Sequence, residues 1–228
     1  MPEPSIALPH YVCRRVHTPL NIDASARNAQ WDMAQPVHLV DAITGEPGRF
    51  ATEVRALYDD TCLYVAFDCQ DDYVWGTVTE REGPIWDEEC VEIFVNPANV
   101  AHQYYEINIS PKGTLFDACI LNPRTQAQPS LAFTGLPEWD VEGLQTDVAI
   151  RGEADRPGKA QAWRAVFAIP HTALIGAPNC PPRPGDRWRI NFYRIDSPQQ
   201  GQRDHYAWST PGIAAFHRPW DFGTLLFE

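Results

Sequence analysis

The sequence predicts an all-β protein, an antiparallel β-sandwich of the immunoglobulin or jelly-roll type with short helical turns. Its apolar segments are short and alternate with polar residues, which is the period of a strand rather than of a helix. Twenty-one Pro and 14 Gly residues separate these segments, as the turns between many strands require. The chain has 228 residues, of which 44% are hydrophobic, so it can bury roughly 70% of the surface that its unfolded form exposes.

Nine segments carry the strand pattern, and that number is typical of a sandwich or barrel. They are residues 50–58, 62–69, 90–95, 103–109, 114–120, 144–150, 160–169, 188–194 and 222–227. Residues 25–32 and 170–175 are expected to form a helical turn or two, the second with Pro170 at its first position. Long irregular connections are expected at residues 122–137 and 176–186.

The segments 50–58 and 62–69 are joined by a turn that begins at Asp59, and they are therefore expected to form an antiparallel hairpin. Both faces of 62–69 are largely apolar, which predicts a central strand. No repeat or linker divides the chain. We expect residues 1–228 to form a single domain, with residues 1–20 as an extended N-terminal segment.

The charge of −12 excludes nucleic acid and anionic membranes as expected partners, because an acidic surface repels phosphate groups. No run of 18 apolar residues occurs, and the N-terminus has neither a basic nor an apolar signal region. We expect a cytoplasmic protein, or a secreted one if a leader lies outside this sequence. Six cysteines without a Cys-x-x-Cys motif are interpreted as free thiols.

The common motifs of nucleophilic, phosphate-binding and zinc-dependent enzymes are absent from the sequence. The seven His residues show no metal-ligand spacing, and only His205 and His217 lie near a segment expected to be functional. The most informative segment is residues 84–95, in which Trp86 precedes a strand whose Glu92 points away from the core. An aromatic ring that covers the C–H face of a sugar, beside a carboxylate that accepts from hydroxyls, is a sugar-binding combination. The alternative is that Trp86 packs on the sandwich and Glu92 is a solvated strand residue.

Several blocks, in their order and spacing, resemble carbohydrate-binding module family 9 from about residue 20 to residue 228. They read NID at 21–23, DDTCLYVAF at 59–67, WDEECVEIFV at 86–95, YYEINI at 104–109, INFYR at 190–194, WS at 208–209 and FG at 222–223. The resemblance implies a DOMON-like β-sandwich that binds a sugar, typically at a chain end, between two aromatic side chains. It also implies that bound calcium is common.

Residue by residue, the resemblance places the two aromatic side chains of the clamp at Trp86 and Phe216 and the carboxylate at Glu92. The family's remaining polar ligands are replaced: its Arg falls on Glu106, its strand Gln on Tyr193 and its loop Asn on Ile213. Glu106 and Tyr193 are therefore candidate hydrogen-bonding residues of a changed site, and the identity of the sugar stays open.

Trp75 follows the expected central strand and is a further candidate for the ligand site, with core or rim packing as its alternative. Calcium needs six to eight oxygen ligands. Asp23, Asp60 and Asp71 are candidate ligands, although acidic residues at turns usually only stabilise the turn.

The resulting hypothesis is a non-catalytic protein that stacks a mono- or oligosaccharide unit against aromatic rings, in association with a separate glycan-active enzyme. One alternative is a glycosidase that uses Glu92 and Glu106, which requires carboxyl groups about 5 to 10 Å apart. Another alternative is a DOMON-like haem protein, which usually has a Met as an axial haem ligand. Met1 and Met33 are the only methionines in the sequence that could serve as this ligand.

Overall fold

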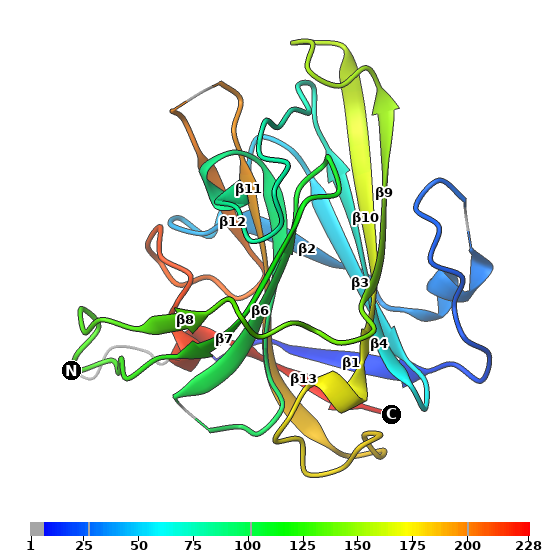
Figure 1. Cartoon of the computed structure of the whole chain (residues 1–228), viewed down its shortest axis with the longest axis vertical. Coiled ribbons are helices and arrows are strands. Elements are labelled where there is room, and N and C mark those ends of the chain that lie inside the picture. The colour runs from blue at the N-terminus through cyan, green and yellow to red at the C-terminus, as the bar shows by residue number, and fades with distance from the viewer. Residues whose placement is uncertain (1–6, 27, 101, 200) are drawn as a thin grey trace.

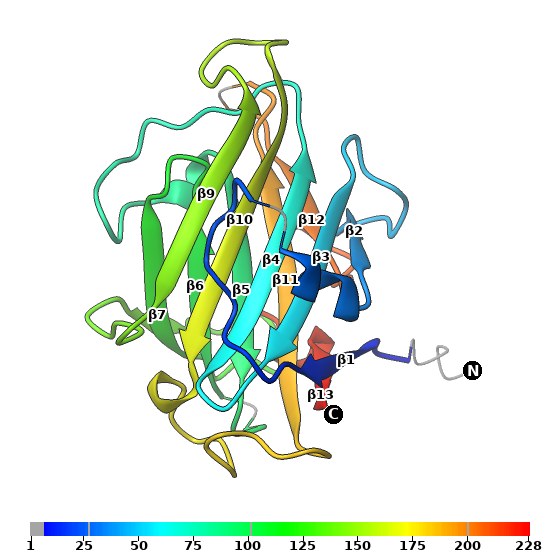
Figure 2. The ribbon, with the colours of Figure 1, turned by 90° about the vertical axis from the view of Figure 1, so that its right-hand side faces the viewer.

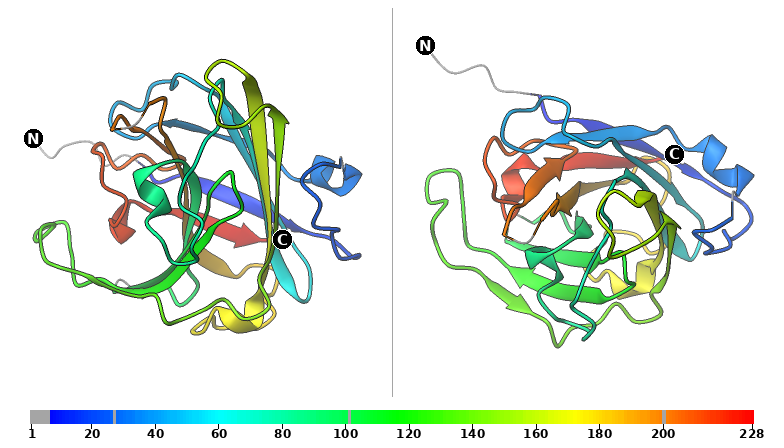
Figure 3. Two further views of the ribbon diagram at one scale, coloured as in Figure 1. Left: turned by 45° about the horizontal axis from the view of Figure 1, so that its top comes forward. Right: turned by 90° about the horizontal axis from the view of Figure 1, so that it is seen from above.

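The computed structural model describes residues 7–26, 28–100, 102–199 and 201–228, and within them the chain forms two β-sheets packed face to face (Figures 1 and 3). The expected all-β sandwich is confirmed. The strands are β1 (His10–Arg15), β2 (Val37–Asp41), β3 (Thr52–Tyr58), β4 (Cys62–Gln70), β5 (Cys90–Asn96), β6 (Gln103–Ile109), β7 (Leu115–Leu121), β8 (Thr134–Leu136), β9 (Gln145–Gly152), β10 (Ala160–Pro170), β11 (Arg187–Asp196), β12 (Asp204–Ala207) and β13 (Gly223–Phe227). Short 3-10 helices are η1 (Ala29–Met33), η2 (Ile85–Asp87), η3 (His171–Ala173) and η4 (Pro219–Asp221).

One sheet runs β8-β7-β6-β5-β11, with β12 and β13 both paired to the free edge of β11. The other sheet runs β2-β3-β4-β10-β9, and Figure 2 shows it facing the viewer. The two sheets are joined along one side, because β12 pairs with β2 and because β1 lies between β13 and β3. None of the described helices has the length and apolarity that crossing a membrane requires.

The main core lies between the sheets, where alternate residues of the central strands meet. Phe67 contacts both Phe167 and Phe192 edge to face, with 6.0 Å between ring centroids in each pair. Two smaller apolar clusters cover the outer faces. One lies on β5, β6 and β11 and includes Phe94, Tyr104 and Phe216. The other lies on β3, β4 and β10 beneath the N-terminal segment that follows β1 (Figure 2). The sheets are therefore apolar on both faces at their centres.

All nine expected strands are present, with ends that differ by at most two residues. The strands β1, β2, β8 and β12 were not predicted, because each contains six residues or fewer. In addition, β1, β2 and β12 take part in pairings between segments distant in sequence. β1 corrects the expectation that residues 1–20 are merely extended, since residues 10–15 are a strand; residues 1–6 lie outside the described residues. It also departs from antiparallel pairing, because it is parallel to both β13 and β3.

The expected helical turns at 25–32 and 170–175 are shorter in the structure, where they correspond to η1 and η3. Arg27 lies outside the described residues. The connection 122–137 is less irregular than expected, because it contains β8 and a bridge between Thr125 and Gln128. All six cysteines are free thiols, as expected, and four of them are buried.

The expected hairpin between β3 and β4 is confirmed, as is the central position of β4 between β3 and β10. Asp59 organises its turn. One carboxylate oxygen accepts hydrogen bonds from the backbone N–H groups of Thr61 (2.7 Å) and Cys62 (2.8 Å), and the other accepts from the buried hydroxyl of Tyr64 (2.7 Å). These donors hold the pKa of Asp59 below its ordinary value, against the opposing effect of burial.

Replacing Asp59 with Ala is expected to destabilise the protein by about 2 kcal/mol, because two turn N–H groups and the Tyr64 hydroxyl lose their acceptor. Urea unfolding monitored by Trp fluorescence measures this change. Asp60→Ala in the same turn is the matched control, since Asp60 makes only an exposed ion pair with Arg15, and it should cost less than about 1 kcal/mol. Equal losses in the two variants would contradict the assignment.

Candidate functional site

A cavity of about 460 Å³ opens on the outer face of the sheet that contains β5, β6 and β11. Its floor comes from strands, and its walls come from η2, from the segment after β7 and from the loop after β12. The lining residues are Trp86, Glu92, Phe94, Glu106, Phe116, Ile120, Phe133, Gly135, Ile195, Arg203, His205, Ala214, Ala215, Phe216 and His217. Segments that are far apart in the sequence thus build one hollow that is aromatic at its sides and acidic at its floor.

Strand alternation places the two carboxyl groups in this floor. On β5, Val91, Ile93 and Val95 enter the inter-sheet core, as expected, so Glu92 points to the other face. On the neighbouring strand β6, Glu106 pairs with Phe94, two residues from Glu92 on the same face. Glu92 and Glu106 are therefore diagonal neighbours across an antiparallel pair, a spacing that long side chains bridge.

Both carboxyl groups are almost inaccessible, with 2% of Glu92 and 5% of Glu106 exposed. Burial raises the pKa of Glu106 to about 7 against the hydrogen bond that it accepts from Asn108 Nδ2 (2.8 Å). Burial, and then the charge of Glu106, raise the pKa of Glu92 well above its ordinary value, and its one short contact is with the thiol of Cys90 (3.4 Å). The pair therefore carries fewer than two negative charges near neutral pH.

A hydrogen-bonded chain fixes the imidazole of His217 beside Glu106. Asn122 Nδ2 donates to the hydroxyl of Tyr104 (3.0 Å), and this hydroxyl is hydrogen-bonded to His217 Nδ1 (2.8 Å). The other ring nitrogen, Nε2, lies 3.7 Å from Glu106 Oε2. Burial lowers the pKa of His217 to about 3, so the ring is neutral. The hydrogen bond from Asn108 favours the ionised form of Glu106.

Aromatic rings form the walls of the cavity. Trp86 packs edge to face on Phe116, with 4.8 Å between centroids, and Phe133 lies over His217 at 3.9 Å. Phe216 is stacked on Tyr193 at 4.0 Å with an interplanar angle of 12°. Such supported rings are held in place before a ligand arrives, and flat apolar surface of this kind suits the C–H face of a sugar.

Arg203, the arginine that lines the cavity, is hydrogen-bonded to η2 at the rim of the cavity. Arg203 donates to the carbonyl oxygen of Trp86 (3.2 Å) and to Asp87 Oδ1 (2.8 Å). It thereby ties the loop before β12 to η2 and holds the backbone on both sides of the entrance. Its charge is matched by Asp87 and does not neutralise the two carboxyl groups on the floor.

The structure brings together four of the six expected ligand-binding residues, namely Trp86, Glu92, Glu106 and Phe216. Tyr193 lies beneath Phe216 and supports it, with its hydroxyl donating to the carbonyl oxygen of Phe216 (3.2 Å). Trp75 is not part of the cavity. It stacks on Tyr73, and its indole N–H donates to the carbonyl oxygen of Ser197 (2.6 Å), so it packs beside the end of β11 and does not line the cavity.

Sequence reasoning missed several lining residues. The position of Phe116 on the outer face could have been predicted, because this residue alternates with core residues on the expected strand 114–120. His205 and His217 were noted only as lying near a functional segment. Phe133 and Arg203 have no local signal, since irregular segments bring them to the site.

A larger cavity, of about 630 Å³, lies over the opposite sheet, between the N-terminal segment and β3, β4, β10 and β9. Three of its charged lining groups are engaged, since Asp68 lies 3.5 Å from Arg164 and 3.6 Å from Arg55, which also pairs with Glu53. The one aromatic residue that lines it, Trp163, has a 2% exposed side chain. The smaller, aromatic cavity therefore fits a sugar better.

The candidate calcium ligands Asp23, Asp60 and Asp71 do not converge. Asp23 accepts from the backbone N–H groups of Ser25 (2.9 Å) and Ala26 (3.1 Å), and Asp60 pairs with Arg15. Asp60 and Asp71 lie at opposite ends of β4. The structure thus assigns Asp23 and Asp60 to local turn and surface contacts.

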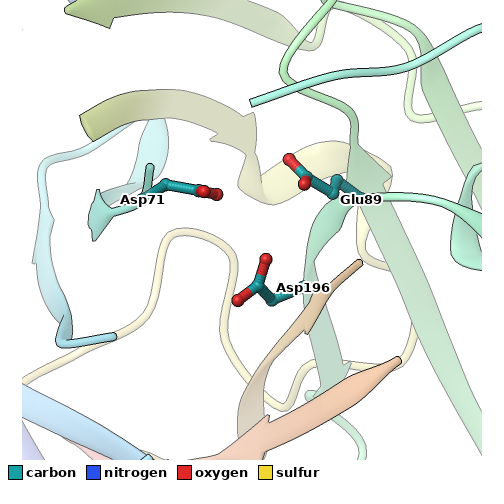
Figure 4. Close-up of side chains that lie close together, drawn as sticks. All are labelled: Asp71, Glu89 and Asp196. Atoms are coloured by element: carbon teal, nitrogen blue, oxygen red, sulfur yellow. The ribbon is translucent and has the colours of Figure 1, made fainter. Parts of the chain in front are cut away.

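Asp71 instead joins Glu89 and Asp196, whose carboxylates point toward one another (Figure 4). One oxygen from each residue lies within 4.8 Å of the others, and all three side chains are buried. Arg194 enters the cluster, with Nη2 2.7 Å from Asp71 Oδ2 and 3.7 Å from Asp196 Oδ1. Both oxygens of Asp196 and Glu89 Oε1 nevertheless have no hydrogen-bond partner. Unpaired hard oxygen donors fit a calcium ion.

Comparison with known proteins supports the expected resemblance. Residues 22–127 match the protein-family model described as carbohydrate family 9 binding domain-like, which confirms the resemblance over this part of the chain. The match ends before the C-terminal blocks that also suggested the family. No curated protein matches the sequence.

Solved structures share the fold across nearly the whole chain. A putative carbohydrate-binding protein from Bacteroides uniformis ATCC 8492 has 19% identity and a TM-score of 0.73, covering 97% of this chain and 100% of that one. A family 9 carbohydrate-binding module from Caldicellulosiruptor kristjanssonii, in complex with cellotriose, has 12% identity and a TM-score of 0.65, covering 96% and 94%. Its complex with glucose gives the same identity and TM-score and covers 96% of each chain. At these identities the likeness shows the fold.

The buried carboxyl pair predicts that stability falls as the pH rises. Because the pKa of Glu106 is raised from 4.5 to about 7 on folding, the folded state holds the extra proton, and that stabilisation is lost between these values. Between pH 5 and pH 8, the difference in unfolding free energy between Glu106→Gln and the wild type should therefore shift in favour of the variant by on the order of 3 kcal/mol. Urea unfolding at pH 5, 6, 7 and 8 measures the difference. Glu142→Gln, on an exposed loop, is the control and should follow the wild type; a parallel profile for Glu106→Gln would contradict the prediction.

Proposed function

We propose that this protein is a non-catalytic sugar-binding protein whose site is the cavity between Trp86 and Phe216. The observation that carries the proposal is the combination of supported aromatic walls with two carboxyl groups on the floor. The family match over residues 22–127 and the solved relatives, one of which is described in complex with cellotriose and with glucose, support it.

In the proposed complex, aromatic faces cover the C–H face of one sugar unit, while the floor residues exchange hydrogen bonds with its hydroxyl groups. Glu106 acts as an acceptor, because the hydrogen bond from Asn108 favours its ionised form. Glu92, with its raised pKa, can act as a donor to the ligand. The cavity volume suits one or two sugar units, which agrees with recognition of a glycan end.

A second candidate is a glycoside hydrolase that uses Glu92 and Glu106, and it is favoured by one observation, the raised pKa of a buried carboxyl pair. Their placement works against this function, since the two carboxyl groups lie side by side on the floor of the cavity, and a glycosidase needs them on either side of the bond that breaks. The haem alternative loses its support, because Met33 lies half-exposed in η1 on the other sheet, and Met1 is outside the described residues.

Trp86→Ala is expected to weaken sugar binding at least tenfold, because a stacking surface is lost. At roughly 0.3 kcal/mol per heavy atom, glucose should bind near millimolar and cellobiose near ten micromolar Kd. Calorimetric titration with glucose, cellobiose, xylobiose, maltose and galactose measures both. Trp220→Ala is the matched control, because Trp220 lines a separate cavity beside Arg189.

No binding at tens of millimolar of any of these sugars, nor of glucosamine or its disaccharide, would contradict the proposed function. The same protein should release no nitrophenol from aryl glycosides. Release that disappears in Glu92→Gln would instead establish the hydrolase.

We also propose that calcium binds at Asp71, Glu89 and Asp196. The unpaired oxygens of Asp196 and Glu89 support this, because a divalent ion offsets the charge that Arg194 leaves unbalanced. A bound ion would join the ends of β4 and β11 to the start of β5, which fixes one side of the cavity floor.

Calcium at about 100 times its Kd should raise the free energy of unfolding by about 2.7 kcal/mol, and the Tm by several degrees. Differential scanning fluorimetry after chelation and re-addition measures the shift. Asp196→Asn should lose the shift, and Asp60→Asn should keep it, because Asp60 lies at the far end of β4. The same Tm with and without calcium would exclude the site.

A further inference from the structure

We propose that the sugar unit bound in the cavity carries a protonated amino group, which lies between Glu92 and Glu106. A 2-amino-2-deoxyhexose unit, as at an end of de-N-acetylated chitin, is the ligand class that fits. This inference rests on the proposed sugar-binding function and specifies its ligand.

The first step is the placement of two like charges. Glu92 and Glu106 stand on adjacent strands, on one face, two residues apart in register, and both line the same cavity. Two carboxylates at this spacing repel each other, and because both are almost fully buried, solvent screens the repulsion only weakly. The ligand-free site relieves this repulsion by holding a proton. An ammonium group between the carboxyl groups replaces that proton and makes charge-assisted hydrogen bonds to both.

The second step is the charge of every group that faces the pair. The neighbouring titratable and charged groups are Cys90 on β5, Tyr104 on β6, Tyr193 on β11, His205 on β12, and Arg124, Arg203 and His217 from the loops. Arg203 is paired with Asp87. Arg124 does not line the cavity; its guanidinium lies 4.7 Å from the centroid of Phe133, and its Nε donates to the carbonyl oxygen of Leu131 (2.5 Å). Burial lowers the pKa of both histidines, so neither supplies a positive charge. Among the described residues that line the cavity, no unpaired cation offsets the floor.

The third step is the state in which Glu106 is held. Asn108 Nδ2 donates to Oε1, and His217 Nε2 lies 3.7 Å from Oε2. The hydrogen bond from Asn108 favours a carboxylate at Glu106, which is the form that an ammonium group requires. A neutral hydroxyl does not supply the positive charge that offsets this carboxylate, and an acetylated amino group has lost its charge. The site therefore discriminates among sugars of the same ring shape by the charge on one substituent.

The test compares three β-1,4-linked disaccharides, those of glucosamine, glucose and N-acetylglucosamine, by calorimetry on the wild-type protein at pH 6.5 and low salt. We expect the glucosamine disaccharide to bind at least about tenfold tighter than the other two. Its affinity should rise from pH 5 to pH 7, as Glu106 loses its proton. Titrations in buffers of different ionisation enthalpy should show proton release with this ligand and none with cellobiose.

Two variants make the test specific. Glu106→Gln and Glu92→Gln should each reduce the preference for the amino sugar at least about tenfold and remove the proton release, because one charge of the pair is gone. Glu142→Gln, far from the cavity, should leave both unchanged. Comparison of the three ligands on the wild type needs no variant to fold, so a misfolded variant does not obscure the result.

The outcomes separate this inference from the function on which it rests. Cellobiose bound as tightly as the glucosamine disaccharide, without proton release, would overturn the inference and leave sugar binding intact. Preference for the acetylated disaccharide would also overturn it. No binding of any of the three would overturn both.

Discussion

The structure depends on β5 being buried on both faces. All seven of its residues are buried. Val91, Ile93 and Val95 pack between the sheets, while the alternate positions lie under a second apolar cluster that includes Phe216 and Ile85. A strand that is buried on both faces has no solvent-exposed position for a carboxylate. Glu92 must therefore either share a proton or find a partner, and the chemistry of the cavity follows from this constraint.

The same strand couples the two acidic sites. Glu89, immediately before β5, belongs to the buried cluster with Asp71 and Asp196, and Glu92 lies three residues further along. Arg194 ties this region together, since it also donates to Thr52 and to the carbonyl oxygen of Gln70. One guanidinium thus connects β3, β4 and β11 across the sandwich. A charge this well enclosed is held by its partners, and removal of one partner costs far more than the pair contributes.

Much of the fold could be predicted from local sequence, because strands buried on both sides show strong alternation or continuous apolar runs. The Asp59 turn and most of the nine predicted strands belong to this class. The strands β1, β2, β8 and β12 do not, since each contains six residues or fewer. β1, β2 and β12 also pair with strands distant in sequence, and β8 is a three-residue strand beside β7. In the site, Trp86 and Glu92 were predictable from one strand and the loop before it. Phe133, Arg203 and the imidazole of His217 were not, because irregular segments position them. The cluster of Asp71 with Glu89 and Asp196 was missed for a related reason: its members come from the ends of three different strands.

The parallel pairing of β1 with β13 has a consequence for biosynthesis. His10–Cys13 line up with Thr224–Phe227, more than 200 positions later, and the backbone N–H of Glu228 donates to the carbonyl oxygen of Cys13. During translation, β1 is made more than 200 residues before β13, and its edge toward β13 stays unpaired until β13 has been made. Pairs so distant in sequence close slowly, and an unpaired strand edge is open to association with other chains. The junction of the two sheets is therefore completed only after β13 has been made.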